Sequence, residues 1–64
     1  MVKINGKELN LAGKPLKKYL ESAGYDIKRI AVERNGEIVP KSMYHETVLT
    51  DADVLEVVSF VGGG

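Results

Sequence analysis

The sequence contains no cysteine. A chain without cysteine has no disulfide framework, no thiol nucleophile and no thiolate metal site. Long apolar runs are also missing. Residues 1–4 lack the apolar core of a signal peptide, and no run approaches the length of a membrane span. We therefore expect a soluble, cytoplasmic protein that makes no membrane contact.

The chain also carries no excess of either charge, because nine basic residues balance nine acidic ones. This balance gives no indication of a nucleic acid or an anionic membrane as a partner. The length of 64 residues predicts a single domain, 1–64, near the lower limit for independent folding. A chain of this size leaves little room for an enclosed substrate pocket, which usually needs about 300 Å³.

Residues with catalytic or metal-binding chemistry are scarce. His45 is the one histidine, and its neighbour Glu46 supplies no nucleophile, so general-base catalysis is poorly supported. Asp51 and Asp53 provide fewer oxygens than calcium requires, and a turn explains them better. The glycines lie in turns or at the chain end rather than in a phosphate-binding motif. We expect no catalytic residue, no metal and no bound cofactor.

Two Asn-Gly pairs, at residues 5–6 and 35–36, predict β-hairpins with two-residue type I′ turns. Each turn fixes a register, and with it the face on which each side chain lies. One face of the first hairpin should carry Val2, Ile4 and Leu9. In the second hairpin, the side facing a helix should carry Ile30, Val32 and Val39, and the outward side Ala31, Glu33 and Ile38.

A helix is predicted from about Pro15 to Ala23, capped by Gly24. Its buried face should be formed by residues at the spacing i, i+3, i+4 and i+7, namely Leu16, Tyr19, Leu20 and Ala23. Residues 41–46 should form a turn or a short 3₁₀ segment, and residues 47–49 a short edge strand. The turn at residues 51–53 then leads into the last strand.

The last strand, from Val54 onward, is rich in β-branched and aromatic residues. It should enter the centre of the sheet, with Leu55 and Val57 facing the helix. The order of elements predicts an α+β fold: a mixed sheet with one helix packed across one face.

The outward side of that strand should carry Val58 and Phe60, next to Ala31 and Ile38 of the second hairpin. An exposed apolar patch often marks a protein contact, and we interpret these four residues as a partner-docking surface. The alternative is that they are scattered apolar residues of the kind found on any protein surface.

The chain ends in Gly62, Gly63 and Gly64. Glycine has no Cβ, so these residues predict a flexible tail, 62–64, that passes where a side chain would clash. The alternative is an ordinary frayed terminus.

A small hairpin-helix-hairpin-strand chain with a terminal di-glycine resembles the β-grasp, ubiquitin-like sulfur carriers. More narrowly, it is similar to the thiamine-biosynthesis sulfur carrier family, ThiS. The similar stretches are residues 4–7, 31–40, 44–46 and 54–64, so the resemblance covers nearly the whole chain. One departure is Ala52, where the family often has glycine between two acidic residues.

The resemblance implies a mechanism centred on the terminal carboxylate of Gly64. A ThiF-like adenylating enzyme uses ATP to adenylate it, and sulfur from a cysteine desulfurase or sulfurtransferase converts it to a thiocarboxylate. A ThiG-like thiazole synthase then takes the sulfur. Gly62 and Gly63 give access to the partner sites. The chain is thus expected to be a carrier and co-substrate rather than an enzyme, and a monomer when alone.

Two alternatives remain at this point. One is another di-glycine carrier, serving molybdopterin, cysteine or tRNA thiolation or conjugated to lysines. The other is a β-grasp interaction or RNA-binding module whose glycine tail is incidental, although the neutral charge argues against RNA.

Overall fold

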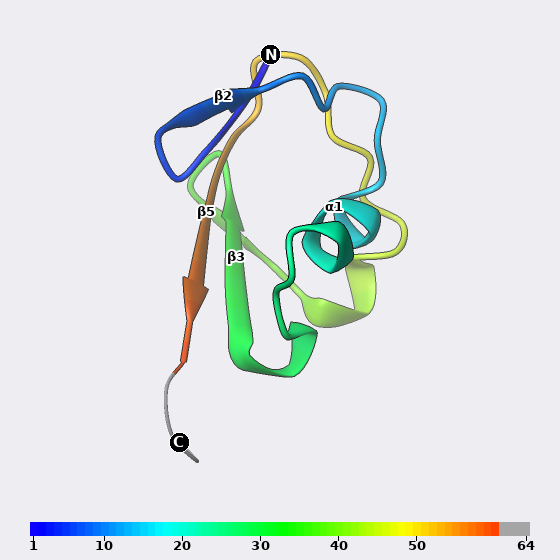
Figure 1. The fold of residues 1–64 in the computed structure, drawn as a ribbon, viewed down its shortest axis with the longest axis vertical. Coiled ribbons are helices and arrows are strands. Elements are labelled where there is room, and N and C mark those ends of the chain that lie inside the picture. The colour runs from blue at the N-terminus through cyan, green and yellow to red at the C-terminus, as the bar shows by residue number, and fades with distance from the viewer. Residues whose placement is uncertain (61–64) are drawn as a thin grey trace.

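The structure, a computed structural model, describes residues 1–60 of the chain. Five strands, one α-helix and two 3₁₀ helices follow one another along this part of the chain (Figure 1). In order they are β1 (Val2–Ile4), β2 (Lys7–Leu9), α1 (Leu16–Ser22), η1 (Ile27–Arg29), β3 (Ile30–Arg34), β4 (Glu37–Val39), η2 (Lys41–Met43) and β5 (Val54–Ser59).

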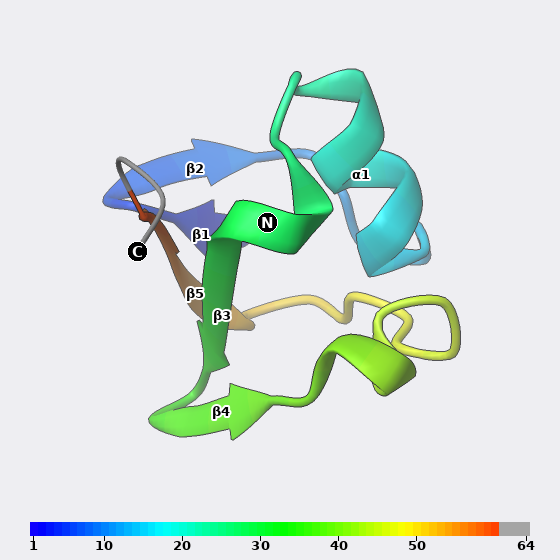
Figure 2. The same cartoon turned by 90° about the horizontal axis from the view of Figure 1, so that it is seen from below.

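The five strands form one mixed sheet in the order β2-β1-β5-β3-β4 (Figure 2). The last strand of the chain lies at the centre, parallel to β1 and antiparallel to β3. Helix α1 lies on one face of this sheet, here called the inner face, and no helix of residues 1–60 covers the opposite, outer face. The predicted α+β fold and the central position of the last strand are confirmed.

Both hairpins have the predicted register. Val2 pairs with Leu9 in the first hairpin, and Val32 pairs with Val39 in the second. The turn asparagines Asn5 and Asn35 have φ of 50° and 51°, and the glycines that follow them also have positive φ. Type I′ turns require positive φ at both central residues, so the Asn-Gly pairs determine where each hairpin reverses.

The hydrophobic core lies between α1 and the inner face of the sheet. Leu16 and Leu20 of the helix are fully buried, as predicted. The same cluster contains inner-face residues of strands β1, β3 and β5 and two residues of the segment before β5, namely Val2, Ile4, Ile30, Val32, Tyr44, Leu49, Leu55 and Val57. Leu9, Val39 and Tyr19 pack against it. The predicted facing of Leu55 and Val57 toward the helix is confirmed.

The helix ends earlier than predicted, at Ser22, and Ala23 is exposed rather than buried. Gly24 takes a φ of 84°, and the next amide, that of Tyr25, donates a hydrogen bond back to the Leu20 carbonyl at 3.1 Å. This hydrogen bond is typical of a helix C-terminus that is capped by a glycine in the left-handed conformation. The chain therefore reverses before Ala23 can reach the core, and the prediction of a fourth buried helical position was wrong.

The loop between η2 and β5 also differs from the prediction. Residues 47–49 form a single antiparallel bridge, between Val48 and Pro15, rather than an edge strand. The segment that they face turns into α1 immediately after Pro15, so pairing stops there. The short 3₁₀ segment predicted within residues 41–46 is confirmed as η2, and the loop buries Tyr44 and Leu49, whose burial the pattern did not indicate.

The turn asparagines have a second role on β5. The Asn5 side chain accepts a hydrogen bond from the Val57 N–H at 2.8 Å and donates one to the Val57 carbonyl at 3.1 Å. On the other edge, the Asn35 side chain accepts from the Val54 N–H at 2.9 Å. Strands β1 and β3 end at these turns and pair with no further residues of β5. The two asparagine side chains therefore form the next hydrogen bonds along each edge of β5 in place of backbone groups.

The turn predicted at residues 51–53 is present, and Ala52 has a φ of 73° there, a conformation that favours glycine. Asp53, next to it, is 5% exposed. The Arg34 guanidinium donates to Asp53 Oδ2 from Nε at 3.0 Å and Nη2 at 2.8 Å, and Asn35 Nδ2 donates to Oδ1 at 3.0 Å. The Thr50 N–H donates to Oδ2 at 2.8 Å. This carboxylate therefore ties β3 to the chain just before β5.

These contacts favour the ionised form of the Asp53 carboxyl. Burial acts to raise the pKa of its carboxyl, but the hydrogen bonds from Thr50, Arg34 and Asn35 outweigh it and lower the pKa from 3.8 to about 2. A carboxyl with a lower pKa in the folded state stabilises the fold above its unfolded pKa, and that stabilisation disappears as the pH falls through the folded pKa.

We expect Asp53 to contribute about 2 kcal/mol to the free energy of unfolding above pH 4, and to lose this contribution between about pH 4 and pH 2. Urea unfolding at several pH values in this range gives the free energy of unfolding of the wild type and of Asp53→Asn, and the difference between the two measures the contribution of the Asp53 carboxylate. The stability gap between the two proteins should be largest near neutral pH and close most of the way by about pH 2. A gap that does not change with pH would contradict the assignment.

Candidate functional site

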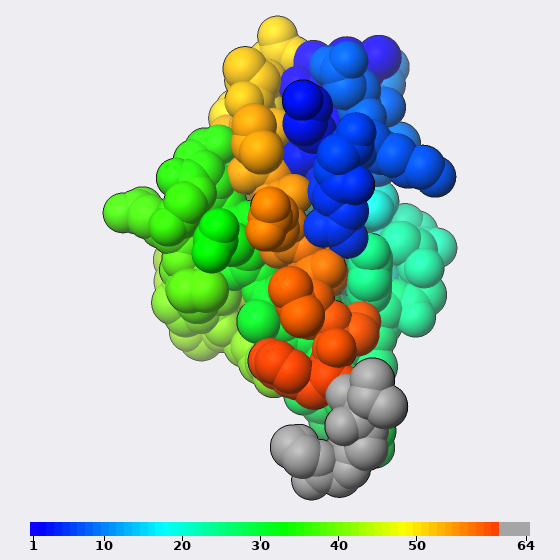
Figure 3. Space-filling view, turned by 90° about the vertical axis from the view of Figure 1, so that its left-hand side faces the viewer, coloured from blue at the N-terminus to red at the C-terminus, as the bar shows by residue number. Residues whose placement is uncertain are grey.

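Figure 3 shows the outer face of the sheet, with β5 in orange between the green second hairpin and the blue first hairpin. The residues predicted to dock a partner lie on this face. Val58 is 54% exposed, Phe60 51% and Ile38 66%, whereas Ala31 is half-buried. All four lie on the side of the sheet away from the core, so the faces predicted for these strand residues are confirmed. Val54, 47% exposed on the same strand, adds an apolar residue that the sequence analysis did not include.

The strand register shows which of these residues lie together. Val58 of β5 is directly opposite Ala31 of β3, and Phe60 follows just beyond the end of β5. Ile38 of β4 is instead opposite Glu33. The four predicted residues therefore lie on one face but not in one uninterrupted apolar patch, because an outward carboxylate stands beside Ile38.

The end of β5 is fixed to the sheet up to Phe60. Ser59 pairs with Ile30, and the Phe60 N–H donates to the Arg29 carbonyl at 2.7 Å. The last described residue thus leaves the sheet beside the start of β3, with its ring half exposed. Gly62, Gly63 and Gly64, predicted as the tail and the chemical site, lie outside the described residues.

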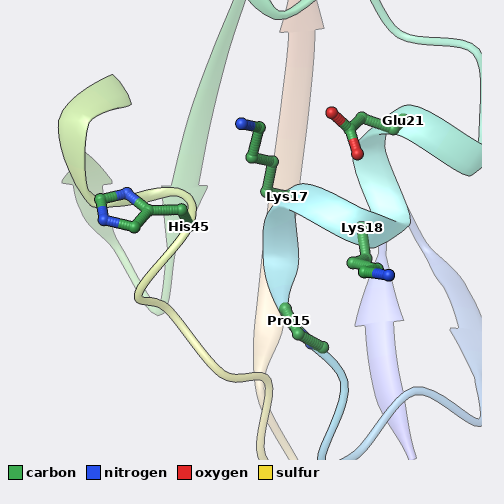
Figure 4. Close-up of a pocket in the computed structure, with 5 residues that line it drawn as sticks. All are labelled: Pro15, Lys17, Lys18, Glu21 and His45. Atoms are coloured by element: carbon green, nitrogen blue, oxygen red, sulfur yellow. The ribbon is translucent and has the colours of Figure 1, made fainter.

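The residues considered for catalysis do not form a site. A shallow hollow of about 290 Å³ beside α1 is lined by Pro15, Lys17, Lys18, Glu21 and His45 (Figure 4). Its two lysines extend in different directions from the helix. The His45 side chain is in none of the hydrogen bonds formed within residues 1–60, and the same part of the chain holds no group of three potential metal ligands. The hollow is therefore lined by solvated charged side chains that are not arranged as an acid–base pair with a nucleophile.

Two further features bear on what the chain contacts. Within residues 1–60, the α-helix is too short and too polar to cross a membrane. The outer face, in contrast, carries exposed apolar side chains up to Phe60, just beyond the end of β5. Such a surface suits contact with another protein.

Comparison with known proteins gives a consistent result. A sequence model of the ThiS family matches residues 2–64. The chain is 42% identical to the sulfur carrier protein ThiS of Bacillus subtilis and 41% identical to that of Thermus thermophilus, in each case over the full length of both chains. A crystal structure of thiamine biosynthesis protein ThiS from Geobacter metallireducens superposes with a TM-score of 0.77 at 25% identity, covering 98% of this chain and 97% of that one.

A second kind of relative is a larger protein. The chain is 48% identical over 62 residues to a thiazole synthase of Paramagnetospirillum magneticum. This match covers 95% of the chain but only 19% of the synthase, so the chain spans about a fifth of that relative's length.

Proposed function

The chain belongs to the ThiS family, and from this premise we propose that it is a sulfur carrier of thiamine biosynthesis that carries the sulfur on the carboxylate of Gly64. The resemblance inferred from the second hairpin and the terminal glycines is thereby confirmed. The observation that carries the proposal is the match, over the whole of both chains, to two proteins named as sulfur carriers. A match of this extent spans the C-terminal residues 62–64 of the chain.

The proposed chemistry begins with the activation of a poor electrophile. An oxygen of the Gly64 carboxylate attacks the α-phosphorus of ATP in the active site of an adenylating partner, and pyrophosphate leaves. The resulting acyl adenylate is a mixed anhydride, so a sulfide equivalent can displace AMP at the carbonyl carbon. The product is a thiocarboxylate. ATP is the partner's substrate in this scheme, and the carrier binds no cofactor.

The sulfur has to come from outside, because the chain has no cysteine. A cysteine desulfurase or a sulfurtransferase would supply it as an enzyme persulfide, whose terminal sulfur attacks the acyl carbon as AMP leaves. A thiol reductant then cleaves the resulting acyl disulfide and releases the thiocarboxylate. A role as co-substrate requires no catalytic group on the carrier, because adenylation and sulfur transfer take place in the active sites of its partners. The three glycines suit a narrow partner channel, since a chain without Cβ atoms passes where other residues clash.

Thiazole synthase is the proposed acceptor of the sulfur. Two relatives named thiazole synthase contain a segment similar to this chain, at 48% and 39% identity, and that segment is about a fifth of each protein. The similar sequence and the synthase thus occur in one polypeptide in those proteins. This supports a functional partnership between the present chain and a thiazole synthase.

The outer face of the sheet is the proposed docking surface, formed by Val58, Phe60, Ala31 and Ile38. Ordering three tail residues in a partner's channel costs on the order of 3–6 kcal/mol of backbone entropy. Burial of apolar side chains on this face offsets that cost. Docking next to the end of β5 also brings the partner close to the residues that follow Phe60.

The carrier role is tested by the mass of the intact protein after reaction with the adenylating enzyme, ATP and a sulfur donor. We expect the wild type to gain about 16 Da, because one oxygen is replaced by sulfur. Gly63→Val should give little product, since a β-branched side chain obstructs the channel. A chain extended by one residue after Gly64 should also fail, because its carboxylate lies beyond the reacting centre.

A tag placed before Met1 serves as the control and should leave the mass gain intact. Equal thiocarboxylate from the wild type, Gly63→Val and the extended chain would refute the carrier role.

A separate expectation concerns Phe60. Because its ring is half exposed, Phe60→Ala should leave the urea midpoint nearly unchanged. Binding to the adenylating enzyme should weaken by about 2 kcal/mol, or roughly thirtyfold in Kd, as for other interface aromatics. Val48→Ala is a matched control, since Val48 is exposed to a similar degree but lies in the loop beside α1 rather than on the sheet. If Phe60→Ala unfolds the protein and leaves the affinity of the folded fraction unchanged, the ring supports the fold rather than docking.

A further inference from the structure

Two carboxylates face each other in the middle of the outer sheet face. Glu33 of β3 is directly opposite Glu56 of the central strand β5. Glu56 is exposed and Glu33 half-buried. Directly opposite residues of an antiparallel pair have Cβ atoms about 5 Å apart, and like charges in such positions repel each other.

The charges of this pair are not matched by an ion pair within the part of the chain that the structure describes. None of the ion pairs formed within residues 1–60 includes Glu33 or Glu56. The nearest cation in the strand register is Lys3, which is opposite Val54, two residues along β5, and is also opposite Glu8. Arg34, the neighbour of Glu33 in the sequence, points to the other side of the strand and binds Asp53.

Apolar side chains flank the carboxylates on both sides. Val58 and Ala31 form the next cross-strand pair toward the end of β5. On the other side lie Val54 of β5 and Ile38, which is opposite Glu33 on β4. A partner that covers the apolar residues therefore also takes the two carboxylates out of water, and burial of unpaired charges is strongly unfavourable.

Building on the proposed carrier role, we propose that this face binds a surface of the adenylating partner that places an arginine between Glu33 and Glu56, with apolar side chains around it. A guanidinium has five N–H donors in a planar fork, so it can donate to both carboxylates at once. Charge-assisted hydrogen bonds of this kind are stronger than neutral ones and fix the orientation of the two surfaces. The arginine thus sets the register of docking, and the apolar residues provide the buried area.

The same charges argue against the other occupants of the face. A second copy of the chain packed face to face would bring an identical acidic pair toward this one, because a two-fold interface uses the same patch on both subunits. A divalent cation such as calcium would find two carboxylates where it takes six to eight oxygens. A basic partner surface both relieves the repulsion and covers the apolar side chains around the two carboxylates, and neither alternative does both.

The test compares Glu33→Gln, Glu56→Gln and the double variant with the wild type in binding to the purified adenylating enzyme at low and high salt. Glu46→Gln, in the loop after η2, removes one negative charge as each single variant does and is the matched control for those. We expect the double variant to bind about tenfold more weakly or worse and to lose most of the salt dependence of association. Its urea midpoint should equal or exceed that of the wild type, because a repulsion has been removed.

Binding of the double variant equal to that of Glu46→Gln, with the same salt dependence, would overturn the inference. So would weaker binding together with a lower urea midpoint, because the carboxylates would then support the fold. A defect confined to thiazole synthase would overturn the choice of partner. The mass gain of the wild type is followed in parallel: if it is present, a negative binding result counts against this inference alone, and if it is absent, the carrier role itself fails.

Discussion

The backbone of β5 has to be hydrogen-bonded along both edges, although β1, its neighbour on one side, is only three residues long. The side chain of Asn5 resolves this mismatch by pairing with both backbone groups of Val57 after β1 has turned away. Asn35 continues the other ladder to Val54 and also holds Asp53. Buried backbone groups without partners are costly. The central strand therefore depends on two side chains that belong to turns.

This constraint links the fold to the proposed function. With β5 held from both sides, its inner residues are fixed in the core and its outer residues are fixed on the free face. Val58 and Glu56 consequently lie in a defined register against Ala31 and Glu33. The strand remains attached to the sheet as far as the Phe60 amide, which donates to Arg29. A partner that binds this face is thereby positioned at the end of β5.

Local patterns predicted much of this arrangement, because the relevant physics is local. The Asn-Gly turns set both hairpin registers, and alternation along the strands separated Leu55 and Val57 from Val58. Contacts between segments that are distant in the sequence could not be predicted from such local patterns. The opposition of Glu33 and Glu56 depends on how β5 aligns with β3, which no turn specifies. Tyr44 enters the core from an irregular loop, and the exposure of Ala23 follows from the exact residue at which the helix ends.

Adenylation of the Gly64 carboxylate is the central step of the proposed function, and isotope exchange between labelled pyrophosphate and ATP reports it directly. The exchange requires that the acyl adenylate form reversibly. We expect label to enter ATP only when the adenylating enzyme and the carrier with a free terminal carboxylate are both present, and not with a carrier whose Gly64 ends in an amide. Exchange that proceeds equally with the amidated carrier would contradict the proposed function. So would the absence of exchange with the native carrier, when the same enzyme does support exchange with its own cognate carrier.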